Sequence, residues 1–170
     1  MQSAQQRFEW LVRSFSSDLF RYAYWLCQHR SIAEDLVQET MLRAWKNIDS
    51  LQEFSAARGW LLTILRHENA RRFERKQFDY SDQDPDEGSS PYASPEDELQ
   101  LQQLQRYMFR LPVEYREPLV LQLLFGMSGD EIATTLSLNL NTVNTRLFRA
   151  RAQLRNLLTP EPSYQGVQHG

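Results

Sequence analysis

Apolar residues recur at spacings of three and four along most of the 170-residue chain, which is the period of one face of an α-helix. One such stripe covers residues 8–26 and a second covers residues 36–48. Ser31 and Glu34 have the spacing of a capping box, so the second helix is predicted to start near Ile32.

A third apolar stripe follows a polar interruption. Asn47–Ala56 mixes Asn, Asp, Ser and Gln and is predicted to form a loop. The helix after it is expected to span about residues 57–76, with Trp60 and Phe73 among its apolar positions. Trp45 belongs in the same way to the stripe before the loop. The first block is therefore predicted to consist of three amphipathic helices.

Residues 77–94 break this pattern. Asp, Ser, Gly, Pro and Gln dominate the segment, which has too little apolar surface to offset the entropy lost on ordering. We expect an extended linker here. Helical periodicity returns after Ser94, which is placed to cap a helix with Pro95 in its first position.

The second block begins with two helices, one on each side of Pro112. The later helix carries an apolar stripe that includes Leu123, and Gly126 is expected to end it, because glycine readily adopts the left-handed conformation of helix C-caps. No segment shows the alternating pattern of a strand, so the fold is predicted to be all-α. Its expected parts are two small helical domains at 1–76 and 95–160, an acidic flexible linker at 77–94 and a disordered tail at 161–170.

The end of the second block has the layout of a helix-turn-helix. Ser128 and Glu131 form a second capping box before a short helix, and residues 137–140 read as the turn. Asn139 or Asn141 caps the last helix, whose first turns hold the small or polar residues that the base-reading end of a recognition helix requires. The same helix has four arginines and no acid, which suits DNA phosphates but would also suit a solvated basic helix in a bundle.

Charge is unevenly distributed along the chain. The net charge of −3 argues by itself against a nucleic-acid partner. However, residues 1–76 carry 12 basic and 9 acidic side chains, residues 77–98 carry 8 acids and no base, and residues 99–160 carry 7 arginines and 4 acids. Two mildly basic blocks therefore flank one acidic segment, and this asymmetry is the informative quantity.

Composition also argues against several classes of protein. The polar start is unlike a signal peptide, and no run approaches the roughly 18 apolar residues of a membrane span. With Cys27 as the single cysteine and three histidines, neither a disulfide nor a Cys/His zinc site is expected, and a reducing cytoplasm is the expected location. There is no glycine-rich phosphate loop, catalytic triad order or paired-carboxylate motif, so we expect no cofactor, no metal and no enzymatic activity.

Two further surfaces have competing interpretations. The third helix has six basic and two acidic side chains with aromatic residues among them, which suits single-stranded nucleic acid but also a solvated face around a core Trp60. The second helix presents the acidic and polar residues Glu34, Asp35, Gln38 and Glu39. These are either ordinary solvated surface or a docking surface for a basic protein.

Two sets of motifs stand in order along the chain. The first consists of AEDLVQET at 33–40, RAW at 43–45 and GWLLTI at 59–64. The second consists of LPVEYR at 111–116, DEIA at 130–133 and NTVNTRLFRAR at 141–151. The first set resembles region 2 of the sigma-70 family of RNA polymerase sigma factors, and the second resembles region 4 with its recognition helix. Two such regions with only a linker between them resemble the small extracytoplasmic-function (ECF) group.

The resemblance implies binding to core RNA polymerase, promoter-specific initiation of transcription, and silencing by an anti-sigma factor that is often membrane-bound and could hold the protein at the inner membrane. Region 2 would dock on the β′ clamp helices through Asp35, Gln38 and Glu39. Region 4 would touch the β flap and read the −35 element through Asn141, Thr142, Asn144, Thr145, Arg146 and Arg149.

The same resemblance implies that region 2 recognises and melts the −10 element. A flipped base would enter the loop at 47–56, and the basic helix after it would hold the melting strand, while the acidic linker would follow the nucleic-acid channel of the polymerase. The residues expected at the −10 element are Asn47, Asp49, Ser50, Phe54, Arg58, Arg66, His67 and Arg71.

Some positions depart from the usual family pattern and leave the promoter sequence open. His67 stands where Asn is usual, Asn139-Leu140-Asn141 replaces Pro-x-Gly, and Asn144 replaces a residue that is often basic. Two rival functions remain at this stage. One is a stand-alone helix-turn-helix regulator, and the other is a helical interaction module that does not bind DNA.

Overall fold

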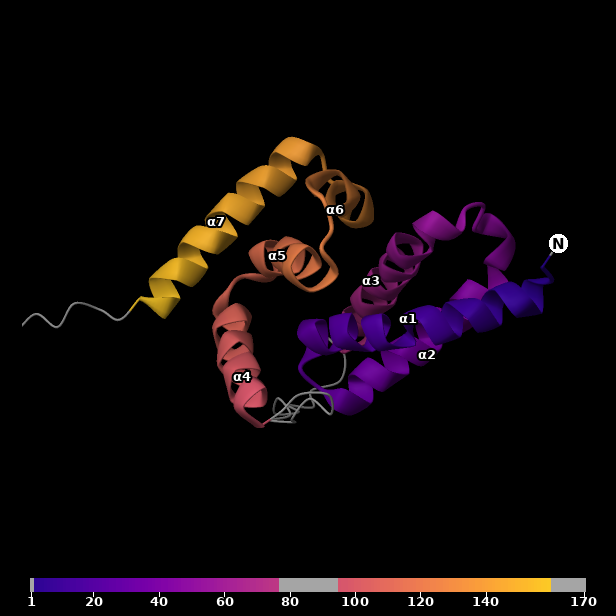
Figure 1. The fold of residues 1–170 in the computed structure, drawn as a ribbon, viewed down its shortest axis with the longest axis horizontal. Helices are drawn as coiled ribbons and strands as arrows, with labels where there is room; N and C mark the ends of the chain where they lie inside the picture. Colours follow the sequence, from indigo (N-terminus) through magenta and orange to yellow (C-terminus); the bar gives the residue numbers. More distant parts are fainter. Residues whose placement is uncertain (1, 77–94, 160–170) are drawn as a thin grey trace, which may run out of the picture.

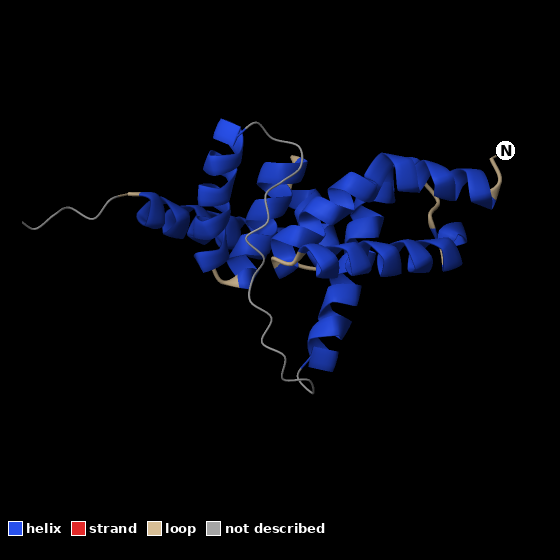
Figure 2. Ribbon diagram, turned by 90° about the horizontal axis from the view of Figure 1, so that it is seen from below, coloured by secondary structure: helices blue, strands red, loops and turns tan. Residues whose placement is uncertain are grey.

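The protein is described here by a computed structural model that covers residues 2–76 and 95–159. Within these ranges the chain forms α-helices and two short 3₁₀ turns and no strand (Figures 1 and 2), which confirms the predicted all-α class. The N-terminal unit comprises α1 (Ala4–Cys27), α2 (Arg30–Lys46), η1 (Ile48–Ser50), η2 (Phe54–Ala56) and α3 (Ala57–Lys76). The C-terminal unit comprises α4 (Pro95–Arg110), α5 (Val113–Phe125), α6 (Gly129–Leu136) and α7 (Leu140–Leu158). The predicted linker at 77–94 and the predicted tail at 161–170 lie outside the described residues.

The junction between α1 and α2 differs from the prediction. Gln28 ends α1 in the left-handed conformation, with φ 60° and ψ 15°. Because this one residue reverses the chain, α2 begins at Arg30 with His29 in the N-cap position, and no side chain caps it. Glu34 forms an ion pair with Arg30 at 3.4 Å instead of closing a capping box. The predicted cap at Ser31 is therefore wrong, and Ser31 lies inside the helix.

The three long helices of the N-terminal unit pack around a common core. Leu11, Leu19, Leu61 and Leu65 are almost completely buried there, as is the large ring of Tyr22. α3 has the predicted bounds, and its apolar face turns inward as expected.

Two aromatic residues of the predicted stripes are exposed. Trp45 is 44% exposed and Phe73 is 54% exposed, so membership of a predicted apolar stripe does not bury either ring. Trp45 lies at the rim of the α1–α2 contact, where its ring meets Phe8 edge-on with centroids 5.2 Å apart. Phe73 lies in the last two turns of α3.

In the C-terminal unit, α5 begins after Pro112 and is ended by Gly126, as predicted. Pro112 occupies the N-cap of α5, and Gly126 ends the helix with a left-handed φ of 59°. Its N–H donates to the Gln122 carbonyl at 3.1 Å, which closes the last turn. Leu123, a member of the predicted stripe, is 56% exposed, because the buried side of α5 is formed by its neighbours.

The helix-turn-helix is formed by α6 and α7, as predicted. The Ser128 hydroxyl accepts a hydrogen bond from the Glu131 N–H at 3.2 Å and so caps α6. Ser137 then turns the chain in the left-handed conformation, with φ 55°. Of the two asparagines predicted as possible caps for α7, Asn139 is the cap. Its Oδ1 accepts a hydrogen bond from the Thr142 N–H at 2.8 Å.

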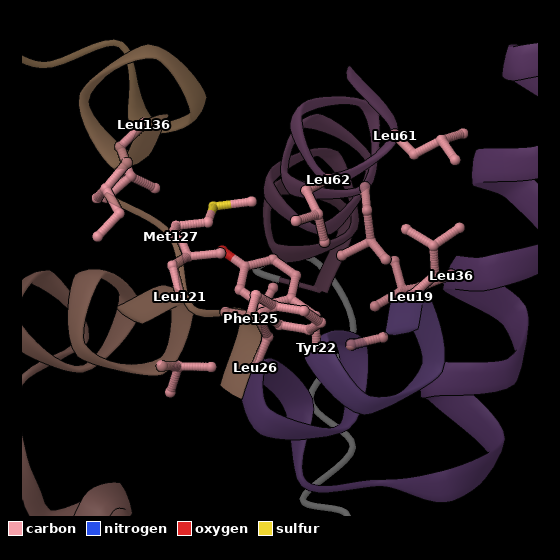
Figure 3. Packing of buried hydrophobic residues seen from close by; sticks show 14 of the residues in the cluster. Leu19, Tyr22, Leu26, Leu36, Leu61, Leu62, Leu121, Phe125, Met127 and Leu136 are labelled. Carbon is pink, nitrogen blue, oxygen red and sulfur yellow. The ribbon is translucent and has the colours of Figure 1, made fainter. Parts of the chain in front are cut away.

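The two units do not stand apart but share one continuous hydrophobic core. α3 packs against α6, and α1 touches α5. Figure 3 shows the junction, where Tyr22 and Leu62 of the N-terminal unit lie beside Phe125 and Met127 of the C-terminal unit. The Tyr22 and Phe125 rings meet edge-on with centroids 6.0 Å apart. The flexible-linker interpretation of the sequence did not anticipate this contact.

Two leucines on α5 test which face of that helix supports the fold. Leu121 is 0% exposed and Leu123 is 56% exposed. Leu121→Ala is expected to lower the free energy of unfolding by about 3 kcal/mol, because it removes buried methyl groups and leaves a cavity. Leu123→Ala, the matched control, is expected to change it by less than about 0.5 kcal/mol. Urea denaturation followed by circular dichroism measures both, and equal losses would contradict the assigned faces.

Candidate nucleic-acid interface

The outer face of α7 presents polar side chains to solvent. Val143, Leu147 and Ala150 are buried against α5 and α6, so the residues between them must point outward. Asn141, Asn144, Thr145 and Arg149 are exposed, and Thr142 and Arg146 are half-buried. All six side chains predicted to read duplex DNA therefore lie on one helix, and four of them are exposed.

Two contacts hold the start of α7 in place. The Asn139 cap fixes the first turn, and the close approach of α6 fixes the direction of the helix. A methyl group added at Gly129 would lie 2.9 Å from Cδ1 of Leu140 and 3.4 Å from Oδ1 of Asn144. The backbone of α6 thus lies directly against the first turns of α7.

Phe148 is a member of this face that the sequence analysis missed. Its side chain is 74% exposed, and it lies one turn after Asn144 and Thr145 on the same side of the helix. A phenylalanine side chain can contact the methyl group of thymine in the major groove. The signal was available in the sequence, because Phe148 falls outside the apolar stripe formed by Val143, Leu147 and Ala150.

The loop predicted to receive a base forms two 3₁₀ turns, η1 and η2. Asn47, Asp49 and Ser50 are exposed there, and the Asn47 side chain donates to the Arg43 carbonyl at 2.9 Å. Phe54 is 46% exposed and packs edge-on against Trp10, with ring centroids 4.8 Å apart.

A hollow of about 280 Å³ opens beside these turns. Its walls combine an aromatic ring with carboxylate, amide and hydroxyl groups, a mixture suited to a nucleobase, which has both an apolar face and polar edges. The lining residues are Ser50, Leu51, Gln52, Glu53, Ala56 and Trp60. The structure therefore brings Ser50 to this hollow together with polar residues that the sequence analysis did not single out.

Two of the arginines predicted to contact the −10 element do not face this hollow. Arg66 forms a two-pronged ion pair with Glu117 of α5, in which Nε and Nη2 each lie 3.1 Å from a carboxylate oxygen. The Arg58 guanidinium lies 5.9 Å from the centre of the Phe125 ring. In this arrangement both side chains contact the C-terminal unit.

The other two basic residues predicted on α3 remain exposed. His67 and Arg71 are both open to solvent. Arg71 lies 3.4 Å from the carboxylate of Glu68, which is buried and also pairs with Arg43 of α2. Glu68 thus ties α2 to α3 and orients Arg71 at the same time.

The acidic face of α2 is open, as its composition predicted. Asp35, Gln38 and Glu39 are all exposed, and their spacing of three and four places them on one side of the helix. Leu36 and Thr40 on the same helix are buried.

Neither a membrane-spanning helix nor a metal site is found in the described part of the chain. No helix there is long and apolar enough to cross a membrane. No group of three or more His, Cys, Asp or Glu side chains is placed to hold a metal ion within the same residues.

An all-helical fold with a helix-turn-helix and a second basic unit defines a class of DNA-binding protein, and comparisons with known families identify which one. Residues 11–78 match the family described as Sigma-70 region 2, and residues 101–154 match Sigma-70, region 4. A stand-alone helix-turn-helix regulator would account for the second match only.

Individual relatives agree with the two matches. The chain is 34% identical to the ECF RNA polymerase sigma factor EcfG of Rhodopseudomonas palustris over 74% of this chain and 71% of the relative. It is 30% identical to the ECF RNA polymerase sigma factor SigW of Bacillus subtilis over 91% and 90% of the two chains. It is also 34% identical to the ECF RNA polymerase sigma factor SigE of Mycolicibacterium smegmatis, but it spans only 65% of the length of that protein.

Solved structures show the same fold. The sigma factor RpoE of Bartonella quintana, in complex with the anti-sigma factor NepR, superimposes with a TM-score of 0.76 at 29% identity over 91% of this chain and 98% of that chain. CnrH, in complex with the cytosolic domain of CnrY, gives a TM-score of 0.65 at 27% identity over 89% and 86% of the two chains. The chain belongs to the extracytoplasmic-function group of sigma-70 RNA polymerase sigma factors.

The cap on α7 can be tested by stability alone. Asn139→Ala is expected to lower the free energy of unfolding by about 1 kcal/mol, because the Thr142 N–H loses its acceptor. Asn141→Ala changes an exposed asparagine two residues later that caps nothing, and it should leave stability unchanged. Thermal unfolding of both variants measures the difference. A larger loss from Asn141→Ala would contradict the assigned cap.

Proposed function

We propose that this chain binds core RNA polymerase and directs it to promoters through two DNA-contacting surfaces, one on α7 and one around η1, η2 and α3. The observation that carries the proposal is the exposed polar face of α7, which follows a capped tight turn. Members of this family act as initiation factors without catalysis, and we extend that role to this chain, with no cofactor.

For the −35 element we assign the face of α7. Asn and Arg side chains pair with the edges of adenine and guanine in the major groove, and Asn144, Thr145, Arg146 and Arg149 are the central candidates. Asn141 and Thr142 lie nearest the helix start, where backbone N–H groups favour a phosphate. We add Phe148 to this set because of its exposure and position.

For the −10 element we assign the hollow beside η1 and η2 and the basic side chains of α3. A flipped base loses a few kcal/mol of stacking, which the aromatic and polar walls of the hollow would offset. Ser50 lines the hollow, and Asn47, Asp49 and Phe54 of the same two turns are assigned to the −10 element with it. Arg58, Arg66, His67 and Arg71 would bind the backbone of the separated strand.

For core polymerase we assign the open face of α2, where Asp35, Gln38 and Glu39 are free to meet a basic surface such as the β′ clamp helices. The C-terminal unit would touch the β flap. We further propose an anti-sigma factor as regulator, since the sigma factor RpoE, which has this fold, was solved in complex with the anti-sigma factor NepR. The protein would then act in the cytoplasm, where core polymerase is found.

Run-off transcription is the most direct test of the proposal as a whole. Core polymerase, a library of genomic promoter fragments and the protein are combined, and transcripts are compared with and without the protein. New transcripts and co-elution with core enzyme are expected. A protein that binds DNA without binding core enzyme would be a regulator of another kind, and one that binds neither would be an interaction module.

Arg149→Ala tests the −35 surface. Loss of a paired arginine costs about 1 to 3 kcal/mol of base discrimination, so transcription from a −35-dependent promoter should fall about tenfold or more. Binding to core enzyme should not change, because α2 is untouched. Arg106→Ala removes an exposed arginine on α4 and serves as control. Equal transcription by the two variants would remove Arg149 from the interface.

Asp35→Arg tests the core-docking surface. Reversing a charge opposite a basic partner should weaken the affinity for core polymerase by about tenfold or more, with an unchanged circular dichroism spectrum. Glu9→Arg makes the same charge change at an exposed site on α1, and the affinity should then stay near that of the unmodified protein. Fluorescence anisotropy with labelled protein gives both values. An unaltered affinity for Asp35→Arg would exclude that residue from docking.

A further inference from the structure

Arg66 and Glu117 make the most specific polar contact between the two units. The carboxylate of Glu117 occupies both donor positions on one edge of the Arg66 guanidinium, at 3.1 Å each. The side chains are only 26% and 15% exposed, so salt screens this pair less than a surface pair. Charge-assisted two-pronged pairs of this kind are among the stronger polar contacts in proteins.

The surroundings favour the charged form of Arg66. Burial would lower the pKa of Arg66, but the hydrogen bonds and the charge of Glu117 raise it above its ordinary value. Burial and the neighbouring Glu117 carboxylate raise the pKa of the Tyr22 phenol well above its usual value. Tyr22 therefore stays neutral, and its buried hydroxyl oxygen adds no competing charge.

Three further contacts join the N-terminal unit to the C-terminal unit, two from α3 and one from Arg21 of α1. The guanidinium groups of Arg58 and Arg21 lie 5.9 Å and 6.0 Å from the centre of the Phe125 ring. Near the start of α3, a methyl group added at Gly59 would meet the Thr135 hydroxyl of α6 at 3.6 Å. The contact thus runs along α3 from Gly59 to Arg66, on the helix assigned above to the separated DNA strand.

A carboxylate and a phosphate compete for the same edge of a guanidinium group, because both offer two oxygens at matching spacing. While Glu117 holds Arg66, that arginine cannot bind a DNA phosphate in the same way. The Arg58 guanidinium lies over the Phe125 ring, so the same junction holds this arginine beside the C-terminal unit but leaves its N–H edges unpaired within the described residues. In contrast, the exposed face of α7 is not covered by this contact, so only the −10 surface is affected.

We propose that the Arg66–Glu117 pair is an autoinhibitory latch, in which a carboxylate of the C-terminal unit takes the place of a DNA phosphate on α3 until the two units separate. The inference rests on the proposed −10 role of α3. The latch disfavours strand binding by the free protein, and the separated units in a polymerase complex expose Arg66 and Arg58 together.

The first experiment measures strand binding by the full chain without polymerase. The probe is a fluorescein-labelled single-stranded DNA of random sequence at low salt, because phosphate contacts are independent of sequence. Glu117→Gln keeps the shape of the side chain and removes its charge, and the dissociation constant should fall at least about fivefold, because apparent affinity follows the open fraction. Glu114→Gln makes the same charge change at an exposed site on α5 and should shift it by less than about twofold.

If the latch is correct, the higher affinity of Glu117→Gln for single-stranded DNA depends on Arg66. Adding Arg66→Ala to Glu117→Gln should therefore remove most of the increase in affinity. Equal affinities for the Glu117→Gln and Glu114→Gln variants, or a gain that survives Arg66→Ala, would overturn the latch.

The second experiment tests the closed arrangement itself and does not depend on how well Glu117→Gln folds. Gly59→Cys and Thr135→Cys are combined in a chain with Cys27→Ser, since the approach of α3 to α6 suits a disulfide. Mild oxidation should cross-link the units, abolish core-dependent run-off transcription and keep strand affinity low, and reduction should restore transcription. The two single-cysteine chains are the controls. Absence of the cross-link, or full transcription by the cross-linked chain, would overturn the proposal.

Transcription with saturating core polymerase separates failure of the latch from failure of the proposed function. Arg66→Ala should lose transcription, whereas Glu117→Gln should transcribe like the unmodified protein, because the units are already apart. Loss of transcription by Arg66→Ala together with control-like strand binding by Glu117→Gln would overturn the latch alone. Full transcription by Arg66→Ala would overturn the −10 assignment and the latch that rests on it.

Discussion

The ion pair between Arg66 and Glu117 joins side chains that are 51 positions apart in the chain. It closes a junction whose apolar part is formed by Tyr22 and Phe125, and together these contacts make one core out of two helical units. Apolar burial holds the units together without direction, while the paired charges fix which side of α3 faces α5. The accessibility of the surface on α3 that we propose for DNA depends on this junction.

The two surfaces proposed to contact DNA therefore differ in their exposure in this structure. The face of α7 is open, because the side of the helix buried against α5 and α6 is the one with Val143, Leu147 and Ala150. The basic side of α3 is partly closed, because Arg58 and Arg66 contact the C-terminal unit. The acidic face of α2 stays exposed in either case, so a partner can reach Asp35, Gln38 and Glu39 without first separating the units.

Local patterns predicted much of the fold. The three- and four-residue spacing gave α3 its bounds, Gly126 ended α5, and Ser128 capped α6, since each of these features depends on residues within a few positions. The same reasoning was wrong in predicting a helix cap at Ser31. The left-handed Gln28 turns the chain early enough for α2 to begin at Arg30, before Ser31. Membership of an apolar stripe also does not bury Trp45, Phe73 or Leu123, which are exposed. A stripe indicates a face but not the extent of the neighbouring helix that covers it.

The candidate sites also divide into features that depend on nearby residues and features that depend on tertiary packing. From the sequence alone came the family resemblance, the all-α class and the helix-turn-helix with the polar start of α7, because these follow from short segments. The tertiary structure alone showed which asparagine caps α7. It also showed the hollow lined by Glu53 and Trp60 and the exposure of Phe148. The pairing of Arg66 with Glu117 was also decided there. Hydrophobic spacing specifies how each helix is buried, but the partner of a charged side chain depends on which distant element the packing brings within about 4 Å of it.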